Sequence, residues 1–309
     1  METLLVTHSA CLEHEVPPGH PECPDRLRAV LGALEAEEFA LLMRVDAPLA
    51  SVEQLERVHP TAQVEKILNS APETGFRRID ADTAMSPGSV EAALRAAGAV
   101  VHAVDEVMAG RARNAFCAIR PPGHHAEPDQ AMGFCLFNNV AIGALHARAA
   151  HGLGRIAVID FDVHHGNGTQ ACFETDPDLF YASTHQWPLY PGTGRAGERG
   201  VGNILNACLP PGAGSAEFRE VFADVVLPAL TQFAPDFIFI SAGFDAHYAD
   251  PLANLRLSED DYGWATTELV QLANRLCDGR VVSTLEGGYD LTALAASARA
   301  HVRALQLAA

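Results

Sequence analysis

Two adjacent histidines, His124 and His125, lie in the segment AIRPPGHHAE, after an apolar stretch and a Pro-Pro-Gly turn. Neighbouring side chains on an extended chain point to opposite faces, so the two imidazoles are expected to contact different partners. Histidine exchanges protons near neutral pH. The doublet therefore indicates acid–base chemistry in which the two rings have separate roles.

A second group of polar residues lies in VIDFDVHHGNGT, where Asp160, Asp162 and His164 alternate along the chain. Alternate side chains of an extended segment share one face, and their origins lie roughly 6.5 Å apart. Two of them can converge on one metal ion through bonds of about 2 Å. A solvated polar loop is the alternative interpretation, because an Asp-x-His pattern alone is a weak signal.

The segment SAGFDAH supplies another carboxylate, Asp245, at the end of an apolar run. Asp162, His164 and Asp245 together predict a catalytic metal site, because three protein ligands leave coordination positions for water and substrate. His247 is the alternative to Asp245 as the third ligand.

The segment LEGGYD places Tyr289 directly behind Gly287 and Gly288. Paired glycines permit a tight backbone that would project the phenol into a cleft. A turn with a packed tyrosine is the alternative.

Short apolar runs alternate with amphipathic segments along the whole chain. Such alternation predicts a doubly wound α/β fold, with a mainly parallel sheet covered by helices on both faces. We expect one domain over residues 1–309. Ligands of such folds bind beyond the carboxyl ends of the strands, where Asp162 and Asp245 lie. The expected strands are residues 3–9, 114–120, 155–163, 179–184, 236–243 and 280–287.

Several residues are expected to mark helix ends. Ser89 is the expected N-cap of a helix that ends before Gly110. Ser258 and Asp261 match a capping box, and that helix is expected to end at Gly279. Another helix is expected to bury a stripe formed by Phe218, Val221, Phe222 and Val225.

The net charge of −18 and the seven cysteines, none in a Cys-x-x-Cys pair, limit the classes of function. An acidic chain repels nucleic acid, so no nucleic-acid partner is expected. The odd cysteine count argues against a disulfide framework and for a reducing compartment. The first residues lack a signal-peptide pattern, and no apolar run approaches about 20 residues. A cytoplasmic protein without a membrane partner is the expectation.

Five segments occur in the order RPPGHHAE, GFCLFNNVAIGA, DFDVHHGNGTQ, SAGFDAH and LEGGYD. Together they resemble the signature segments of the histone deacetylase superfamily, especially its class II-like members and bacterial histone deacetylase-like amidohydrolases. GHPECPDRL at residues 19–27 and LERVHPTAQVEKI at residues 55–67 are similar to its N-terminal segments. The resemblance covers nearly the whole chain.

This resemblance implies the three-layer α/β/α arginase/deacetylase fold. The implied activity is zinc-dependent removal of acetyl or other acyl groups from acyl-lysine peptides, proteins or similar amides, with release of acetate. One catalytic zinc ion would be bound by Asp162, His164 and Asp245. A structural potassium ion would be bound by Asp160, backbone carbonyls of Asp162 and His164, Ser183 and Thr184. A tunnel for the acyl-lysine side chain would be lined by Gly133, Phe134, Tyr190 and Leu252.

The resemblance also assigns catalytic roles. His124 and His125 match the tandem catalytic histidines, Asp160 and Asn167 match their respective hydrogen-bond partners, and Tyr289 matches the catalytic tyrosine. Asn167 stands where class I enzymes carry Asp. An amide adds no charge, so His125 is expected to be less basic than His124. His125 is then the expected main proton carrier, and a charged His124 the electrostatic element.

Other functions remain as alternatives. An acetylpolyamine amidohydrolase shares fold and chemistry, but its polyamine-selective members place a glutamate where this chain has Leu252. An arginase-like ureohydrolase would need a further carboxylate beside Asp245. A non-catalytic acyl-lysine binder would be expected to lack Tyr289 or a metal ligand, and both are kept.

The remaining features receive structural interpretations. Ser86 and the loop of residues 70–88 are expected at the tunnel rim, and His185 near the cleft. Assembly into a homo-oligomer is left open. The histidines expected to be structural or solvated, with no convergent partner, are His14, His59, His102, His146, His151 and His301.

Overall fold

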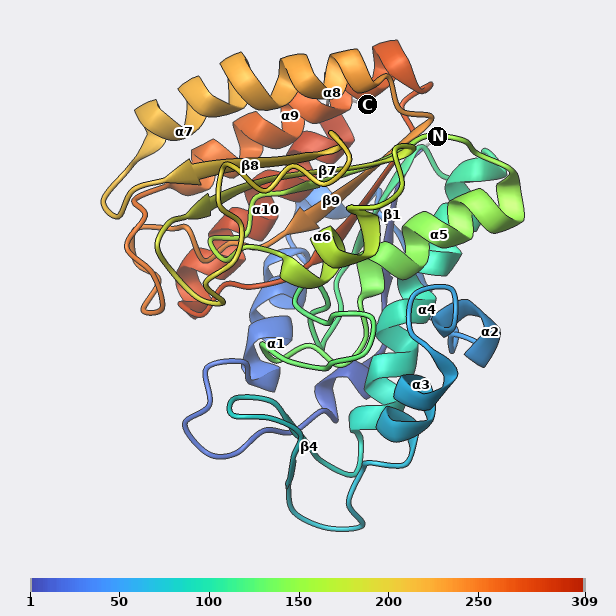
Figure 1. Ribbon diagram of the computed structural model, residues 1–309. Coiled ribbons are helices and arrows are strands. Elements are labelled where there is room, and N and C mark those ends of the chain that lie inside the picture. Colours follow the sequence, from blue (N-terminus) through green and yellow to red (C-terminus); the bar gives the residue numbers. More distant parts are fainter. Residues whose placement is uncertain (1, 308–309) are drawn as a thin grey trace.

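Eight short segments pair into one parallel sheet in the computed structural model, which describes residues 2–307 (Figure 1). The strand order is β2-β1-β5-β10-β9-β6-β7-β8, and every neighbouring pair is parallel. The strands are β1 (Thr3–Thr7), β2 (Met43–Asp46), β5 (Asn114–Cys117), β6 (Ile156–Asp160), β7 (Leu179–Gln186), β8 (Ile204–Leu209), β9 (Phe237–Ala242) and β10 (Val281–Leu285).

The six strands expected from the sequence are confirmed, and the two missed strands of this eight-stranded sheet lie at its edges. The central strands β5, β10, β9 and β6 are buried at every residue, which explains their continuous apolar runs. The edge strand β2 has four residues that alternate between half-buried and exposed. The other edge strand, β8, includes Asn206. Neither edge strand is a continuous apolar run.

Helices cover both faces of the sheet and give three layers (Figure 1). On one face, α4 (Ser89–Met108) packs on β1 and β5, and α5 (Asn139–His151) packs on β6 and β9. On the other face, α10 (Leu291–Leu307) packs against β5, α1 (Pro24–Ala33) and α9 (Glu259–Leu276). The short elements are α2 (Val52–Leu55), α3 (Thr61–Leu68), α6 (Asn167–Phe173), α7 (Ser215–Val221), α8 (Leu227–Phe233) and the hairpin strands β3 (Arg77–Arg78) and β4 (Ala84–Met85). This arrangement confirms the α/β fold class.

The helix ends agree with the sequence in part. Ser258 and Asp261 form the expected capping box of α9, and Gly110 follows α4 with a φ of 66°. The assignment of Ser89 as N-cap is wrong: Gly88 is the N-cap of α4. The Ser89 hydroxyl instead accepts a hydrogen bond from the Ser86 amide at 2.7 Å.

The expected stripe on the segment after Gly214 is wrong at Val225. Phe218 and Phe222 are buried, but Val225 is 42% exposed. A π-helical segment, Phe222–Val226, separates α7 from α8 and rotates the following residues away from α-helical register. The end of α9 also differs, because the helix stops at Leu276 before Gly279.

The carboxyl ends of the parallel strands all lie at one edge of the sheet. The loops after β5, β6, β9 and β10 carry His124, Asp162, Asp245 and Tyr289, respectively. This edge is therefore where the predicted site residues meet. Within residues 2–307, no helix combines the length and apolar character that crossing a bilayer requires.

Candidate metal centre and active site

Asp162, His164 and Asp245 converge on one buried point at the sheet edge. Nδ1 of His164 lies 3.2 Å from Oδ1 of Asp162 and 3.1 Å from Oδ2 of Asp245. One ligand atom from each of the three residues lies within 4.8 Å of the other two. Two carboxylates and one imidazole form a donor set that suits zinc. The chain thus has a buried site of the kind predicted from its sequence.

Backbone contacts orient the two carboxylates. Asp162 Oδ2 accepts a hydrogen bond from the Gly287 amide at 2.8 Å, and Asp245 Oδ1 accepts one from the Val163 amide at 2.8 Å. A Cβ atom at Gly243 would collide with Asp162, and one at Gly287 would collide with Asp245. Glycine at these two positions is therefore a requirement of the carboxylate arrangement.

The charges of this group are strongly coupled. Burial alone would lower the pKa of His164, but its hydrogen bonds to Asp162 and Asp245 raise that pKa to about 10. Burial and the charge of Asp162 raise the pKa of Asp245. Two buried carboxylates close together favour a bound cation. The electrostatics agree with the donor set in fitting a metal ion.

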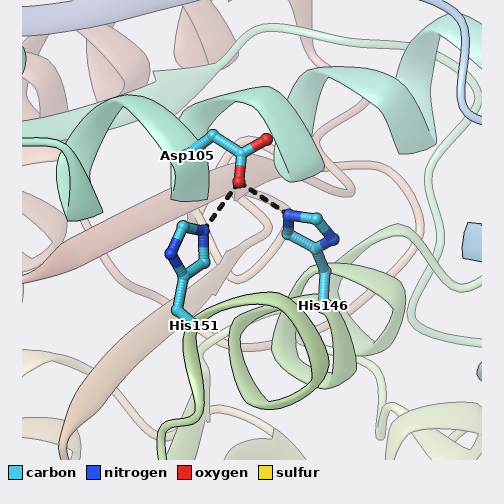
Figure 2. A group of neighbouring side chains, drawn as sticks. All are labelled: Asp105, His146 and His151. Carbon is cyan, nitrogen blue, oxygen red and sulfur yellow. Dashed lines mark hydrogen bonds and ion pairs between the residues drawn. The ribbon is translucent and has the colours of Figure 1, made fainter.

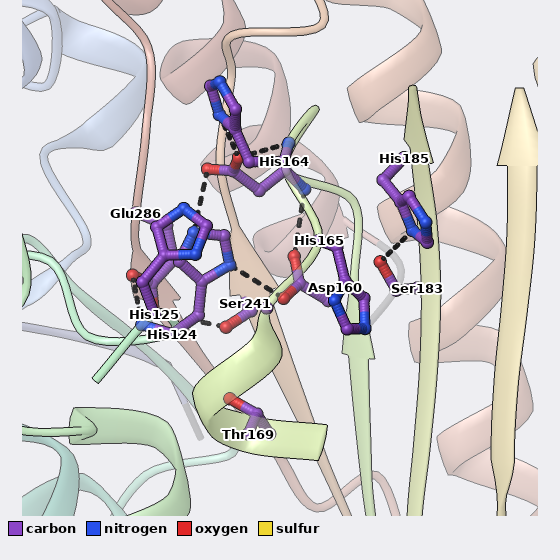
Figure 3. A network of polar contacts seen from close by, with 12 residues as sticks. His124, His125, Asp160, His164, His165, Thr169, Ser183, His185, Ser241 and Glu286 are labelled. Carbon is purple, nitrogen blue, oxygen red and sulfur yellow. Dashed lines mark hydrogen bonds and ion pairs between the residues drawn. The ribbon is translucent and has the colours of Figure 1, made fainter. Parts of the chain in front are cut away.

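His124 pairs with the carboxylate that ends β6 (Figure 3). Its Nδ1 lies 2.9 Å from Oδ2 of Asp160, and its Nε2 lies 3.8 Å from Oδ2 of Asp162. Burial alone would lower the pKa of His124, but these two carboxylates outweigh burial and hold the pKa well above its ordinary value. Both contacts favour the protonated form of His124.

His125 contacts a different partner, as the adjacency of the two histidines predicted. Its Nδ1 lies 2.8 Å from Oδ1 of Asn167, while Nδ2 of Asn167 donates to Glu127 at 2.7 Å. Burial, His124 and His164 together hold the pKa of His125 well below its ordinary value. Because Nδ1 donates to the amide oxygen, Nε2 of the neutral ring is free to accept a proton.

Tyr289 is held from two sides. Its backbone amide donates to Asp250 at 2.7 Å, and the Arg26 guanidinium lies 4.9 Å from the centre of its ring. Arg26 also donates to the carbonyl oxygens of Glu286 and Gly288. Burial raises the pKa of Asp250 to about 7. The segments that carry Arg26 and Asp250 thus hold the loop of Tyr289 in place.

One cavity of about 210 Å³ brings the predicted tunnel residues together with the predicted catalytic residues His125 and Tyr289. Its lining consists of Asp82, His125, Gly133, Phe134, His164, Tyr190, Leu252 and Tyr289. The Tyr190 ring lies 5.2 Å from the His125 ring and 6.2 Å from the His164 ring. The cavity therefore opens directly onto the buried metal centre.

The turn at residues 133 and 134 forms part of this cavity through an uncommon backbone. Phe134 has a φ of 69°, which is costly for a bulky residue. The Gly133 amide donates to Asp82 at 3.1 Å, and the Phe134 amide donates to Thr83 at 3.0 Å. A Cβ atom at Gly133 would lie 2.5 Å from the His125 ring. The loop of residues 70–88 thus reaches the site, as expected.

Two acids of the site, the buried Glu286 and the half-buried Asp82, were missed from the sequence. Glu286 Oε2 accepts hydrogen bonds from the amides of Gly123 and His124 at 2.7 and 3.1 Å, and its Oε1 accepts one from Ser241. Burial raises the pKa of Glu286 to about 7. The other missed acid is Asp82. Buried acids next to glycine-rich turns are the signal that would have identified Glu286.

The expected cation-binding residues also lie together. Asp160 and Ser183 are direct partners across β6 and β7. The hydroxyl oxygen of Thr184 is buried and has no hydrogen-bond partner within residues 2–307. His185, which was expected near the cleft, bonds Ser183 at 2.8 Å and is not among the residues that line the cavity.

The structure decides three expectations about side chains. His247 Nε2 lies 3.2 Å from Glu259 and is not part of the buried ligand group, which favours Asp245 as third ligand. Ser86 is buried and bonds the Glu15 amide, so it does not line the cavity. His146 and His151 were expected to lack a convergent partner; that prediction is wrong, because both contact Asp105.

The fold and the buried Asp-His-Asp centre define a protein of the deacetylase type. The histone deacetylase domain family model matches residues 20–305, and the chain belongs to this family. It is accordingly an amidohydrolase of the deacetylase class.

Relatives of this chain include plant and bacterial proteins. It is 43% identical to "Histone deacetylase 14, chloroplastic" of Arabidopsis thaliana, over 98% of this chain and 76% of that protein. It is 42% identical to "Histone deacetylase-like amidohydrolase" of Pseudomonas aeruginosa, over 88% of this chain and 73% of that protein. A solved structure, "Crystal Structure of HDA15 HD domain", matches with a TM-score of 0.92 and 36% identity, over 99% of this chain and 88% of that chain.

Proposed function

We propose that this protein is a zinc-dependent deacetylase that removes acetyl or other acyl groups from the side-chain amine of acyl-lysine and releases the carboxylic acid. The observation that carries the proposal is a single cavity lined by His125, His164, Tyr289 and the aromatic rings of Phe134 and Tyr190. A narrow apolar channel ending at a metal centre fits a long aliphatic side chain with an amide at its tip.

The proposed zinc ligands are Asp162, His164 and Asp245. Their donor types, their convergence and the glycines packed against the carboxylates support this assignment. When bound there, zinc acts as a Lewis acid that polarises the acyl carbonyl and acidifies water.

We assign the proton transfers mainly to His125. Its low pKa keeps the ring neutral, and the contact with Asn167 leaves Nε2 as the acceptor. Nε2 can take the proton of the attacking water and return a proton to the leaving amine. His124, held cationic by Asp160, stabilises the negative charge that develops on the substrate.

Tyr289 is assigned the hydrogen bond to the developing oxyanion. Burial and nearby carboxylates raise the pKa of its phenol, so the hydroxyl keeps its proton and can donate. Donation to an oxyanion in a pocket of low polarity lowers the activation barrier by about 3–4 kcal/mol. Arg26 positions the tyrosine through its ring, and Asp250 positions it through its backbone amide.

Acyl-lysine is favoured over acetylpolyamines because the wall of the cavity carries Leu252 where polyamine-selective members have a glutamate. An acetylpolyamine substrate is the second candidate, since the net charge of −18 attracts cationic amines. An arginase-like reaction is less well supported: the buried ligand group at the sheet edge has two carboxylates and one imidazole, which suits one metal.

A structural potassium ion is proposed at Asp160, the backbone carbonyls of Asp162 and His164, Ser183 and Thr184. The buried, unpartnered hydroxyl of Thr184 within the described chain supports this site. A cytoplasmic location, the absence of nucleic-acid and membrane partners, a single domain over residues 1–309 and the open choice of a homo-oligomer all stay predictions from the sequence.

The test compares the turnover of a fluorogenic acetyl-lysine peptide, a longer acyl-lysine peptide and acetylspermidine, with zinc quantified. Turnover is expected to stop with a chelator and return with zinc. The Tyr289→Phe variant, which removes only the phenolic oxygen, is expected to lower kcat by about 10²–10³-fold with little change in KM.

Two results would contradict the proposal. Turnover that survives complete metal removal would exclude metal-dependent catalysis. Binding of acyl-lysine peptides without chelator-sensitive hydrolysis of any acyl amide would favour a non-catalytic acyl-lysine binder.

A further inference from the structure

A second cluster of metal-binding side chains joins the two helices on one face of the sheet (Figure 2). Asp105 of α4 faces His146 and His151 of α5. The Nε2 atoms of both histidines lie 2.7 Å from the same carboxylate oxygen, Oδ1 of Asp105. Two imidazoles from one helix thus converge on one carboxylate of its neighbour.

This cluster lies far from the catalytic centre. The N-cap of α5, Asn138, contacts Ala126 and Thr169 beside the catalytic histidines. From Asn138 to His151 the helix rises about 20 Å. His151 precedes β6, which begins at Ile156, so the cluster lies toward the amino ends of the strands. It cannot share the ion of the catalytic site.

The chemistry of the cluster suits a divalent transition metal. Two imidazole nitrogens and one carboxylate oxygen form a common set of three zinc ligands. The three ligand atoms lie within 4.8 Å of one another. Around a tetrahedral zinc ion with bonds of about 2.0–2.1 Å, the ligand atoms lie farther apart than hydrogen-bonded atoms do. The nitrogen and oxygen atoms of this cluster would have to move apart by less than about 1 Å to reach such positions.

The exposure of the cluster leaves room for a fourth ligand. The His146 side chain is 6% exposed, whereas those of His151 and Asp105 are 24% and 40% exposed. One side of the cluster therefore faces solvent, and water can complete a tetrahedron.

Arg57 opposes metal binding at this cluster. Its Nη1 lies 2.5 Å from Nδ1 of His146 and is a donor, so Nδ1 is the acceptor and Nε2 carries the proton. A metal ion on Nε2 would move that proton to Nδ1, against the guanidinium. Glu53, 3.3 Å from Nη2, offers Arg57 an alternative partner at the surface. The affinity of the cluster should therefore depend on residue 57.

We propose that Asp105, His146 and His151 form a second binding site for a divalent transition metal such as zinc, which bridges α4 and α5. The site is separate from the catalytic centre, because it is remote from the substrate cavity. Its affinity is reduced by Arg57, which must move toward Glu53 when the ion binds.

The experiment counts metal ions on the full chain after chelator treatment, by equilibrium dialysis with Zn²⁺ and by the visible absorption of bound Co²⁺. The wild type is expected to bind two equivalents, one of which is lost in His164→Ala. The affinity for the other equivalent is expected to fall by more than about 100-fold in His151→Ala and in Asp105→Asn. This loss is larger than that caused by substituting a residue that only contacts a metal ligand. Arg57→Gln is expected to tighten it by about 10-fold.

His102→Ala is the matched control, because His102 lies on α4 one turn before Asp105 and faces Glu106 at 4.0 Å. It should keep both equivalents. The proposal is overturned by the absence of an equivalent that is independent of His164, by its survival in both His151→Ala and Asp105→Asn, or by its loss in His102→Ala. Failure of the catalytic site would instead appear as the absence of the equivalent that depends on His164.

Discussion

Oδ1 of Asn167 lies 2.8 Å from Nδ1 of His125, and this amide distinguishes the surroundings of the two proposed catalytic histidines. The equivalent contact of His124 is with a carboxylate, that of Asp160. An amide orients a ring without adding charge. Burial and the charges of His124 and His164 then lower the pKa of His125, whereas Asp162 and Asp160 raise that of His124.

The Asn167→Asp variant is expected to move the acidic limb of the pH–rate profile upward by about one to three pH units, because a carboxylate stabilises protonated His125. The pKa of His125 is low in the wild type, so the ring is neutral and can accept a proton at neutral pH. Raising that pKa keeps the ring protonated up to a higher pH than in the wild type. Activity is then lost at a higher pH on the acidic side and recovers as the pH rises.

This prediction is checked by kcat/KM for an acetyl-lysine peptide across the pH range, with zinc content measured to show that the metal site is intact. An acidic limb that stays in place would show that His125 is not the group whose deprotonation activates the enzyme.

Leu252 is expected to limit the choice of substrate. In Leu252→Glu, a carboxylate on the cavity wall can bind the distal ammonium of acetylspermidine, and hydrogen bonds to charged groups contribute about 1.5–3 kcal/mol. The ratio of kcat/KM for acetylspermidine to that for acetyl-lysine peptide should rise by about 10- to 100-fold.

The control is Leu252→Gln, which has the same shape as glutamate without its charge and should change the ratio much less. Equal ratios in the two variants would mean that charge at this wall does not select the substrate.

Glu286 is expected to position the loop of His124 and His125, the proposed catalytic histidines, through its hydrogen bonds to the Gly123 and His124 amides. Glu286→Ala leaves both amides buried and unpaired, which costs about 1–3 kcal/mol each in the free energy of unfolding. The displaced loop should also lower kcat. Glu286→Gln keeps an oxygen for the amides and should retain most stability and activity.

Urea unfolding and kcat measurements on the two variants check this prediction. If Glu286→Gln and Glu286→Ala lower the free energy of unfolding and kcat equally, Glu286 acts through its charge and not through its hydrogen-bonding oxygen atoms.

The sequence predicted the elements with strong local patterns. The buried strands β5, β6, β9 and β10 are continuous apolar runs, and their ends located the residues that form the metal centre. The capping box at Ser258 was also predictable from the sequence, because the motif lies within four residues.

The features that were missed depend on tertiary contacts. Ser89 has the right residue type for an N-cap, but its hydroxyl bonds Ser86 and His14 within the fold. The partner of His146 and His151 is Asp105, on a different helix, and no local spacing reveals that pair. The position of Asp82 at the cavity follows from a hairpin without apolar periodicity.

The clamp of Arg26 on the loop of Tyr289 has a consequence for the order in which the enzyme is completed during synthesis. Arg26 Nε donates to the carbonyl of Gly288 across a sequence separation of 262 residues. A chain that has left the ribosome through β9 and the Asp245 loop already contains all three proposed metal ligands, but not the Glu286 and Gly288 carbonyls that Arg26 binds. The proposed metal ligands are therefore synthesised before the tyrosine loop, and the proposed active site is complete only when the last segment joins the first.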